Sequence, residues 1–241
     1  LKTFLVQGNF FKAGVAKSMV DIRPVEVEEF RATEELIREA FWNHFQPGAD
    51  EHFIAHSLRN SSDYLPSLDL VAISSDGKLV GSIVYSKSKI QTEDGRTLTD
   101  VITFGPLGVL PEYRNRGIAA KLIQESIRLA KLQGFRAVII QGDPRFYGRL
   151  GFRCGEKYDL TNSEGQFCVG LMAYELYPGA LDGTGGCFSE SEAFGVSEEA
   201  LAEFDASFPV KEKGESAFQN EFAVLLSLCY AKDPKYGPSD T

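Results

Sequence analysis

The sequence is poor in the residues that bind zinc or cross-link small secreted domains. Its 241 residues include only four cysteines, and no two of them form a C-x-x-C pair. A zinc site and a disulfide scaffold are therefore not indicated. Three of the four lie among apolar residues, which favours buried, reduced thiols and a cytoplasmic location. The cysteines are Cys154, Cys168, Cys187 and Cys229.

Long apolar runs are also missing. No run reaches the roughly 18 residues of a membrane-spanning helix, so we expect no membrane partner. Residues 1–19 make a poor signal peptide, because a Gln-Gly-Asn stretch interrupts their apolar residues. We expect an N-terminal extension there, with Met19 as a candidate original start.

An excess of basic residues is absent. The net charge is -9, and residues 178–241 alone contain 12 acidic and 4 basic residues. A nucleic-acid partner requires a clustered basic face, so this balance argues against one. We predict three parts: an extension at 1–19, one α/β domain at 20–177 and an acidic appendage at 178–241.

Two common phosphate-binding motifs, G-x-G-x-x-G and the G-K-[ST] of Walker A, do not occur. A different arrangement is present in "YRNRGIAAKL", residues 113–122, where two arginines and Gly117 precede an apolar pattern of helical period that Gly134 ends. The first N–H groups of a helix have no partners within it and favour anions, and glycine permits close approach. The alternative is an ordinary turn whose arginines extend into water.

The other patterns predict strands alternating with helices. A strand from about Val20 precedes helices at 28–45 and 51–59, and residues 68–90 predict a hairpin with a Ser-Asp-Gly turn. Pro144 can start a short helix that Gly151 ends. Further strands are expected at 98–110, 135–143, 152–158 and 169–176. The fold class is therefore α/β, with a mixed sheet covered by helices on both faces.

The acidic appendage predicts two helices. Ser197 can cap the first, and Ser216 with Gln219 forms a capping box for the second. Both helices carry apolar faces that cannot stay exposed, so they must dock. The alternatives are the chain's own sheet and a second copy of the protein, which would make a homodimer.

In this order of elements, two motifs resemble the GCN5-related N-acetyltransferase superfamily, most closely its YhbS-type branch. The family's acetyl-CoA motif, Arg/Gln-x-x-Gly-x-Gly/Ala at a helix start, is matched by Arg114, Gly117 and Ala119. Its second signature, a tyrosine followed four and five residues later by glycine and phenylalanine, is matched by "YGRLGF", residues 147–152. The resemblance covers about residues 20–176 and implies a mixed, mostly antiparallel sheet.

The resemblance implies acetyl-CoA as a co-substrate. The strand before the motif would splay from its neighbour, so that pantetheine pairs with the exposed backbone of Leu107 to Val109. The pyrophosphate would lie on the helix start, with Arg116 or Lys121 adding charge-assisted contacts. The implied cofactor-binding residues are Leu107, Gly108, Val109, Arg114, Asn115, Arg116, Gly117, Ile118, Ala119 and Lys121.

Tyr147 stands where the family places its general acid. A phenol within reach of the thioester sulfur can protonate the departing CoA thiolate. The alternative is a core tyrosine that packs beside Phe146 and Phe152.

The general base is not identified by any motif. An ammonium acceptor must lose a proton before it attacks, so a carboxylate or a water route to one is needed. Asp100, on the strand that leads to the motif, is the first candidate, followed by Glu51 and Asp143. Each of these is equally a surface or helix-capping carboxylate, and Asp143 precedes the helix that Pro144 begins.

His52 and His56 have the i, i+4 spacing of two metal ligands on one helical face. A third ligand is missing, and Glu51 precedes His52 instead of following it, so the metalloprotease motif is not met. We therefore expect no metal, and we expect these histidines to face the substrate cleft or solvent.

The predicted function is transfer of an acetyl group from acetyl-CoA to a primary amine by direct attack in a ternary complex. The acceptor would be a small amine or a peptide amine. The alternative is a CoA-binding module that senses without turnover. For the appendage we expect either a wall of the acceptor pocket or a cap that only stabilises one end of the sheet.

Overall fold

The structure, a computed structural model, describes residues 20–232 of the chain. The predicted extension at residues 1–19 lies outside the described residues. Within them, no helix is both long enough and apolar enough to span a bilayer.

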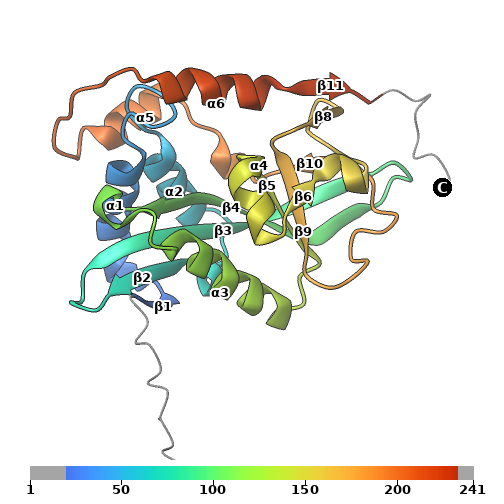
Figure 1. The fold of residues 1–241 in the computed structure, drawn as a ribbon, viewed down its shortest axis with the longest axis horizontal. Coiled ribbons are helices and arrows are strands. Elements are labelled where there is room, and N and C mark those ends of the chain that lie inside the picture. Colours follow the sequence, from blue (N-terminus) through green and yellow to red (C-terminus); the bar gives the residue numbers. More distant parts are fainter. Residues whose placement is uncertain (1–19, 233–241) are drawn as a thin grey trace, which may run out of the picture.

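A nine-stranded mixed sheet forms the centre of the described chain (Figure 1). The pairs β4–β5 and β7–β10 are parallel, and all the other strand pairs of this sheet are antiparallel. The main order along the sheet is β1 (Val20–Pro24), β2 (Leu70–Ser74), β3 (Leu79–Thr92), β4 (Thr97–Val109), β5 (Ala137–Gln141), β9 (Leu171–Glu175) and β6 (Arg153–Cys154). The expected mixed, mostly antiparallel α/β fold is confirmed.

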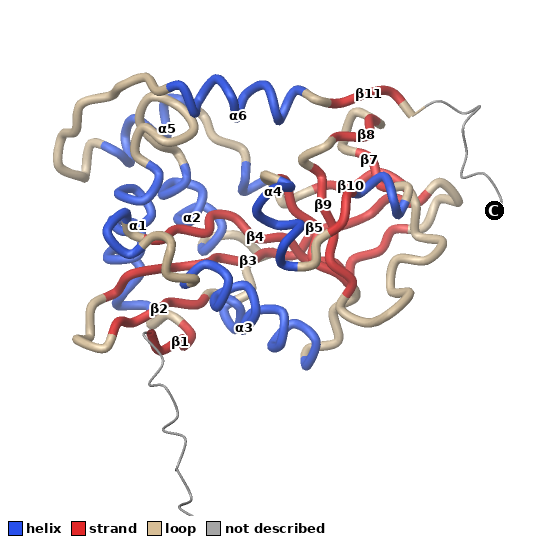
Figure 2. The backbone as a smooth tube through the Cα atoms, viewed as in Figure 1, coloured by secondary structure: helices blue, strands red, loops and turns tan. Residues whose placement is uncertain are grey.

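Helices cover both faces of this sheet because the side chains of its strands alternate. On β3, Ile83 and Tyr85 belong to the core that includes α3 (Ile118–Leu132), whereas Val84 belongs to the core of α1 (Phe30–Phe41) and α2 (Glu51–Arg59). All three β3 side chains are completely buried. Figure 2 shows α1 and α2 apart from α3, with the long strands passing between them.

The first helix is shorter than predicted. It ends at Phe41 instead of Phe45, because Asn43 adopts a positive φ of 57° that a helix does not tolerate. Asn43 Oδ1 accepts hydrogen bonds from the N–H of Gly48 at 2.8 Å and of Gly214 at 3.0 Å, which hold this turn in place. The loop between α1 and α2 therefore carries His44 and Phe45 out of the helical pattern.

The segment after β5 also departs from expectation in part. The helix α4 (Pro144–Tyr147) begins at the predicted proline, and Gly151 ends the following turn with a φ of 97°. The strand expected at 152–158 is wrong in extent, since only β6 is extended and residues 155–158 form a 3-10 helix.

The acidic segment contains the two predicted helices, α5 (Glu198–Asp205) and α6 (Ala217–Ser227). The predicted capping is present at both: Ser197 accepts from the N–H of Ala200, and Ser216 with Gln219 forms a capping box. Sequence reasoning missed two strands of this segment. They are β10 (Gly186–Ser189), which pairs with β3 and β7 (Leu160–Thr161), and β11 (Cys229–Ala231), which pairs with β8 (Gln166–Cys168).

The expectation of buried, reduced thiols is wrong for one pair of cysteines. Cys168 on β8 and Cys229 on β11 are joined by a disulfide, and only Cys154 and Cys187 are free thiols among the described residues. The pair is separated by 61 residues in sequence, so no spacing motif revealed it. The bond fixes the C-terminal end of α6 to the body of the molecule.

Candidate active site

A gap between β4 and β5 forms the floor of the candidate site. The two strands pair only at Val101 with Ala137 and at Ile102 with Val138, and then separate. A cavity of about 680 Å³ lies where they diverge, lined from β4 by residues 104–109 and from the end of β5 by residues 141–143. The splayed strands thus expose the β4 backbone that the resemblance assigned to pantetheine.

The start of α3 borders the same cavity. Gly117 caps the helix with a φ of 75°, and Asn115 also has a positive φ, of 59°. Within the described chain, no N–H of residues 115–120 donates a hydrogen bond to a backbone carbonyl, whereas the N–H of Lys121 donates to the carbonyl of Gly117. Convergent N–H groups at a helix N-terminus are suited to binding phosphate.

Of the ten residues predicted to bind the cofactor, eight line this cavity. The exceptions are Arg116 and Lys121. Arg116 instead donates to the Glu112 carbonyl and lies 5.0 Å from the centre of the Tyr113 ring. Arg114 does line the cavity, and its guanidinium donates to the carbonyl of Ala40.

Tyr147 lines the cavity from α4. Its ring packs between Phe104 and Phe152, with centroid distances of 5.8 and 5.6 Å, so it also meets the description of a core tyrosine. A Cβ at Gly142 would lie 2.3 Å from Tyr147 Cε2, and the glycine therefore makes room for the ring. Burial, and secondarily the Asp143 carboxylate, raises the pKa of Tyr147. The hydroxyl therefore stays protonated at neutral pH.

The three carboxylates suggested as bases lie in different surroundings. Asp100 pairs with Arg136 at 3.0 Å and is not among the residues that line the cavity. Asp143 lines it but pairs with Arg145 at 2.7 Å and caps α4, and the Arg145 guanidinium lowers its pKa. The position of Asp100 gives no support to a role in proton transfer.

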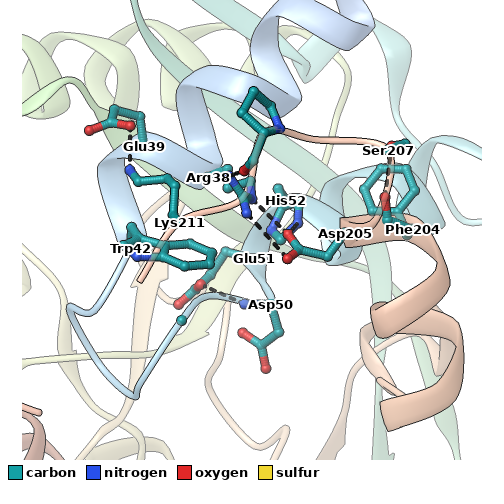
Figure 3. Close-up of polar contacts among 12 residues, drawn as sticks. Arg38, Glu39, Trp42, Asp50, Glu51, His52, Phe204, Asp205, Ser207 and Lys211 are labelled. Atoms are coloured by element: carbon teal, nitrogen blue, oxygen red, sulfur yellow. Dashed lines mark hydrogen bonds and ion pairs between the residues drawn. The ribbon is translucent and has the colours of Figure 1, made fainter. Parts of the chain in front are cut away.

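Glu51, the first residue of α2, lines the cavity. Burial, and then the adjacent Asp50 carboxylate, raises its pKa to about 8. The N–H of Asp50 donates to Glu51 Oε2 at 3.2 Å (Figure 3). Glu190, which follows β10, is a further carboxyl of the lining besides Glu51 and Asp143, and burial raises its pKa as well.

The two histidines of α2 do not face the cleft. His52 is fully buried, and its Nε2 lies 3.0 Å from Asp205 Oδ1, which also accepts from Arg38 Nε at 2.6 Å (Figure 3). Burial lowers the pKa of His52 to about 4. His56 Nδ1 lies 3.0 Å from Glu34 Oε1. The expected cleft or solvent position is therefore wrong for His52, and the described residues hold no cluster of metal-ligating groups.

Helix α6 and the loop after α1 form an aromatic side of the cavity. Phe45 stacks on Phe222 at 4.0 Å, and His44 stacks on Phe218 at 4.6 Å. All four side chains line the cavity. Figure 1 shows α6 along the top of the molecule, running from above α1 and α5 to β11 beside β8, where the disulfide holds its far end.

Comparison with known proteins identifies the fold family. A family model for the acetyltransferase (GNAT) domain matches residues 21–155. The curated relative YhbS of Escherichia coli K12, an uncharacterized N-acetyltransferase, is 31% identical over 145 residues, which cover 58% of this chain and 81% of YhbS. The chain belongs to the GNAT acetyltransferase family. The resemblance seen in the sequence is thereby confirmed.

Solved GNAT structures agree with this assignment. The crystal structure of Escherichia coli YhbS in complex with CoA superposes with a TM-score of 0.64 at 26% identity, over 73% of this chain and 92% of YhbS. A GNAT acetyltransferase from Brucella melitensis in complex with acetyl-CoA has a TM-score of 0.59 at 24% identity, over 73% of this chain and 98% of that one, and shows the fold alone.

Several residues of the GNAT cavity were missed from the sequence. His44 and Phe45 were assigned to a helix, and Glu190, Phe194, Phe218 and Phe222 to an appendage. The aromatic repeat at 218 and 222 carried a helical signal, but nothing in the sequence said which surface that helix would meet. Glu190 and Phe194 carried no signal.

Proposed function

We propose that this GNAT protein transfers an acetyl group from acetyl-CoA to a primary amine by direct attack in a ternary complex. The observation that carries the proposal is a single cavity that runs from the unpaired N–H groups at the start of α3, along the exposed edge of β4, to Tyr147. These groups fit a pyrophosphate, a pantetheine chain with its amides, and a thioester sulfur in that order. CoA and acetyl-CoA bound in the related structures support the same cofactor.

In this proposal the chain divides its tasks between the two sides of the cavity. Residues 114–119 hold the pyrophosphate, and the backbone of Leu107 to Val109 pairs with pantetheine. Glu51 accepts a proton from the ammonium form of the acceptor. The amine nitrogen then attacks the thioester carbon and the C–N bond forms. As the C–S bond breaks, the Tyr147 hydroxyl donates its proton to the departing sulfur, and the surplus proton on the acetylated nitrogen returns to Tyr147, which leaves a neutral amide and CoA thiol.

Glu51 is favoured as the base because of where it lies. It lines the acceptor side, whereas Asp100 does not line the cavity. A carboxyl with a pKa of about 8 is close to the operating pH, and this is the range in which a general base is most effective. Asp143 is disfavoured because Arg145 already neutralises it.

Release of CoA thiol from acetyl-CoA, measured against a panel of amines, amino acids and lysine peptides, tests the proposal. Mass spectrometry of the product should show one added acetyl group on nitrogen. Retained binding of acetyl-CoA without any acetylated product would contradict the transferase and favour a CoA-binding module.

We further propose that residues 20–177 form the acetyltransferase domain and that residues 178–241 are an acidic appendage that completes its acceptor side. The appendage provides Glu190, Phe194, Phe218 and Phe222 to the cavity lining. A cytoplasmic location and a homodimer stay predictions, to be tested by cell fractionation and by light scattering. The Cys168–Cys229 disulfide contradicts the reduced cysteines on which the prediction of a cytoplasmic location was based.

A further inference from the structure

Apart from His44, the ionisable groups on the acceptor side of the cavity are carboxyl groups. The charged residues of the lining are Glu51, Arg114, Asp143 and Glu190. Arg114 precedes α3 and donates to the Ala40 carbonyl. Burial, and then the Arg114 charge, lowers the pKa of His44, so Arg114 acts on the acceptor side as well. Asp143 pairs with Arg145. Glu51 and Glu190 remain, and no ion pair joins either of them to a residue in the described part of the chain. A cation is therefore the complementary ligand there.

The same side is walled by aromatic rings from three separate parts of the chain. Phe41 and Phe45 come from the end of α1 and the loop after it, Phe194 from the segment after β10, and Phe218 and Phe222 from α6. Phe194 lies so close to β4 that a Cβ at Gly105 would be 2.9 Å from its Cε1. These rings favour an apolar and particularly an aromatic group, which can stack on them.

We propose that the acceptor is a primary amine carried on an apolar, preferably aromatic, group and bearing no carboxylate. This inference rests on the proposed acetyl transfer. The ammonium group meets Glu51 and Glu190, and the ring is buried among the phenylalanines of α1, α6 and residue 194. Burial of apolar area supplies most of the affinity, and the carboxyls orient the nitrogen.

Two other acceptor classes fit this side less well. A free amino acid brings a carboxylate, which would face Glu51 and Glu190, while Arg114, the basic residue of the lining, already donates to the Ala40 carbonyl and is proposed to hold the pyrophosphate. A polyamine has the correct charge but would leave the phenyl rings without an apolar partner while its further ammonium groups lose water. A small arylalkylamine satisfies both features at once.

The test compares four acceptors at saturating acetyl-CoA: 2-phenylethylamine, phenylalanine, phenylalanine methyl ester and 1,4-diaminobutane. We expect kcat/KM for 2-phenylethylamine to exceed the values for phenylalanine and for diaminobutane by roughly tenfold or more. The methyl ester, which removes the negative charge but keeps the size, should recover most of the loss. Calorimetry of 2-phenylethylamine with the CoA-loaded protein measures binding independently of turnover.

Variants of α6 test whether the preference for an aromatic amine depends on this helix. Two variants of Phe222 should each lower the affinity and kcat/KM for 2-phenylethylamine by roughly tenfold. They are Phe222→Ala and Phe222→Leu, of which the second keeps the apolar bulk. Val224→Ala is the matched control, because this residue lies on the same helix, is exposed and does not line the cavity.

Each outcome separates this inference from acetyl transfer itself. If phenylalanine or diaminobutane is acetylated as well as 2-phenylethylamine, the acceptor class is wrong and the transferase stands. If 2-phenylethylamine binds in a Phe222-dependent manner but no amine is acetylated, the pocket is correct and the transferase is wrong. If neither binding nor product is found, both are overturned.

Discussion

Tyr147 both packs in the core and lines the cavity, so a structural role and a role as the general acid are compatible. Tyr147→Phe retains the ring and removes only the hydroxyl. We expect kcat to fall by about 100-fold, the scale of a lost general acid, with unchanged acetyl-CoA affinity. Steady-state kinetics and calorimetry measure the two quantities. Wild-type turnover in this variant would assign Tyr147 to packing alone.

Gly117 combines a positive φ with open space toward the cavity. Gly117→Val places a branched side chain beside the N–H groups proposed for the pyrophosphate, so acetyl-CoA should bind at least about tenfold more weakly. Gly77→Val is the matched control, because Gly77 has a φ of 84°, meets nothing within 4 Å and lies in the β2–β3 turn. Both variants share the backbone strain. If calorimetry finds the same acetyl-CoA affinity for Gly117→Val and Gly77→Val, the cofactor does not bind at the start of α3.

Glu51 should determine the pH dependence of the reaction. Its pKa is raised to about 8, so the carboxyl is protonated and unable to accept a proton below that pH. We expect kcat/KM for the acceptor to rise as pH increases through about 8, and Glu51→Gln to abolish most activity together with this rise. Asp100→Asn should leave the profile unchanged. A retained rise in Glu51→Gln would identify another base.

At the scale of elements, α6 is held at both ends. Near its start, Gln219 Nε2 donates to the Asn43 carbonyl at 3.0 Å, and near its end the Cys168–Cys229 disulfide and the β8–β11 pairing attach it. The ion pair of Glu221 with Arg145 joins its middle to α4. The position of Phe218 and Phe222 over the cavity therefore depends on these attachments.

Removing the Cys168–Cys229 disulfide should make the α6 side of the acceptor site more mobile. We expect Cys229→Ser to raise the acceptor KM several-fold while the acetyl-CoA KM changes less than twofold, because the attachments of α6 given above are to residue 43, α4 and β8. Cys154→Ser, which alters a free thiol, is the control. Equal increases in both constants would mean that the disulfide serves the whole fold. This variant is cleaner than deletion from Ser189 onward, which would also remove Glu190 and Phe194 from the lining.

The elements that the sequence predicted well are those with a local signal. The helix at 118–132 had an apolar period and a glycine at each end, and α6 had a capping box. The end of α1 was mispredicted because Asn43 is fixed by the N–H of Gly214, which is 171 residues away. The missed strands and the disulfide have the same explanation. Their pairing partners are distant in the sequence, so neither hydrophobic pattern nor residue spacing could identify those partners.

At the scale of the whole molecule, the acidic segment is attached to the domain through buried charge. Arg38 on α1 has only 5% of its side chain exposed and binds Asp205, which His52 also contacts. These contacts join α5 to α1 and α2. The negative charge of the segment is thus partly used in contacts with the domain.

Asp205→Ala should therefore lower the free energy of unfolding by about 2 kcal/mol or more, because it leaves the buried guanidinium of Arg38 without its carboxylate. Urea denaturation measures this change. The control is Asp94→Ala, whose ion pair with Arg96 is more than half exposed on both sides and should contribute less than about 1 kcal/mol. Equal losses in the two variants would show that Asp205 does not secure α5.

The two sides of the cavity come from separate parts of the sequence. Residues 107–119 surround the cofactor path, whereas Phe218 and Phe222 come from a helix about 100 residues later that is attached to the loop after α1, to α4 and to β8. Substitutions in α6 can therefore reshape the acceptor side without disturbing the start of α3. In an evolving lineage, the choice of amine can change through the C-terminal segment while the capacity to use acetyl-CoA is inherited intact.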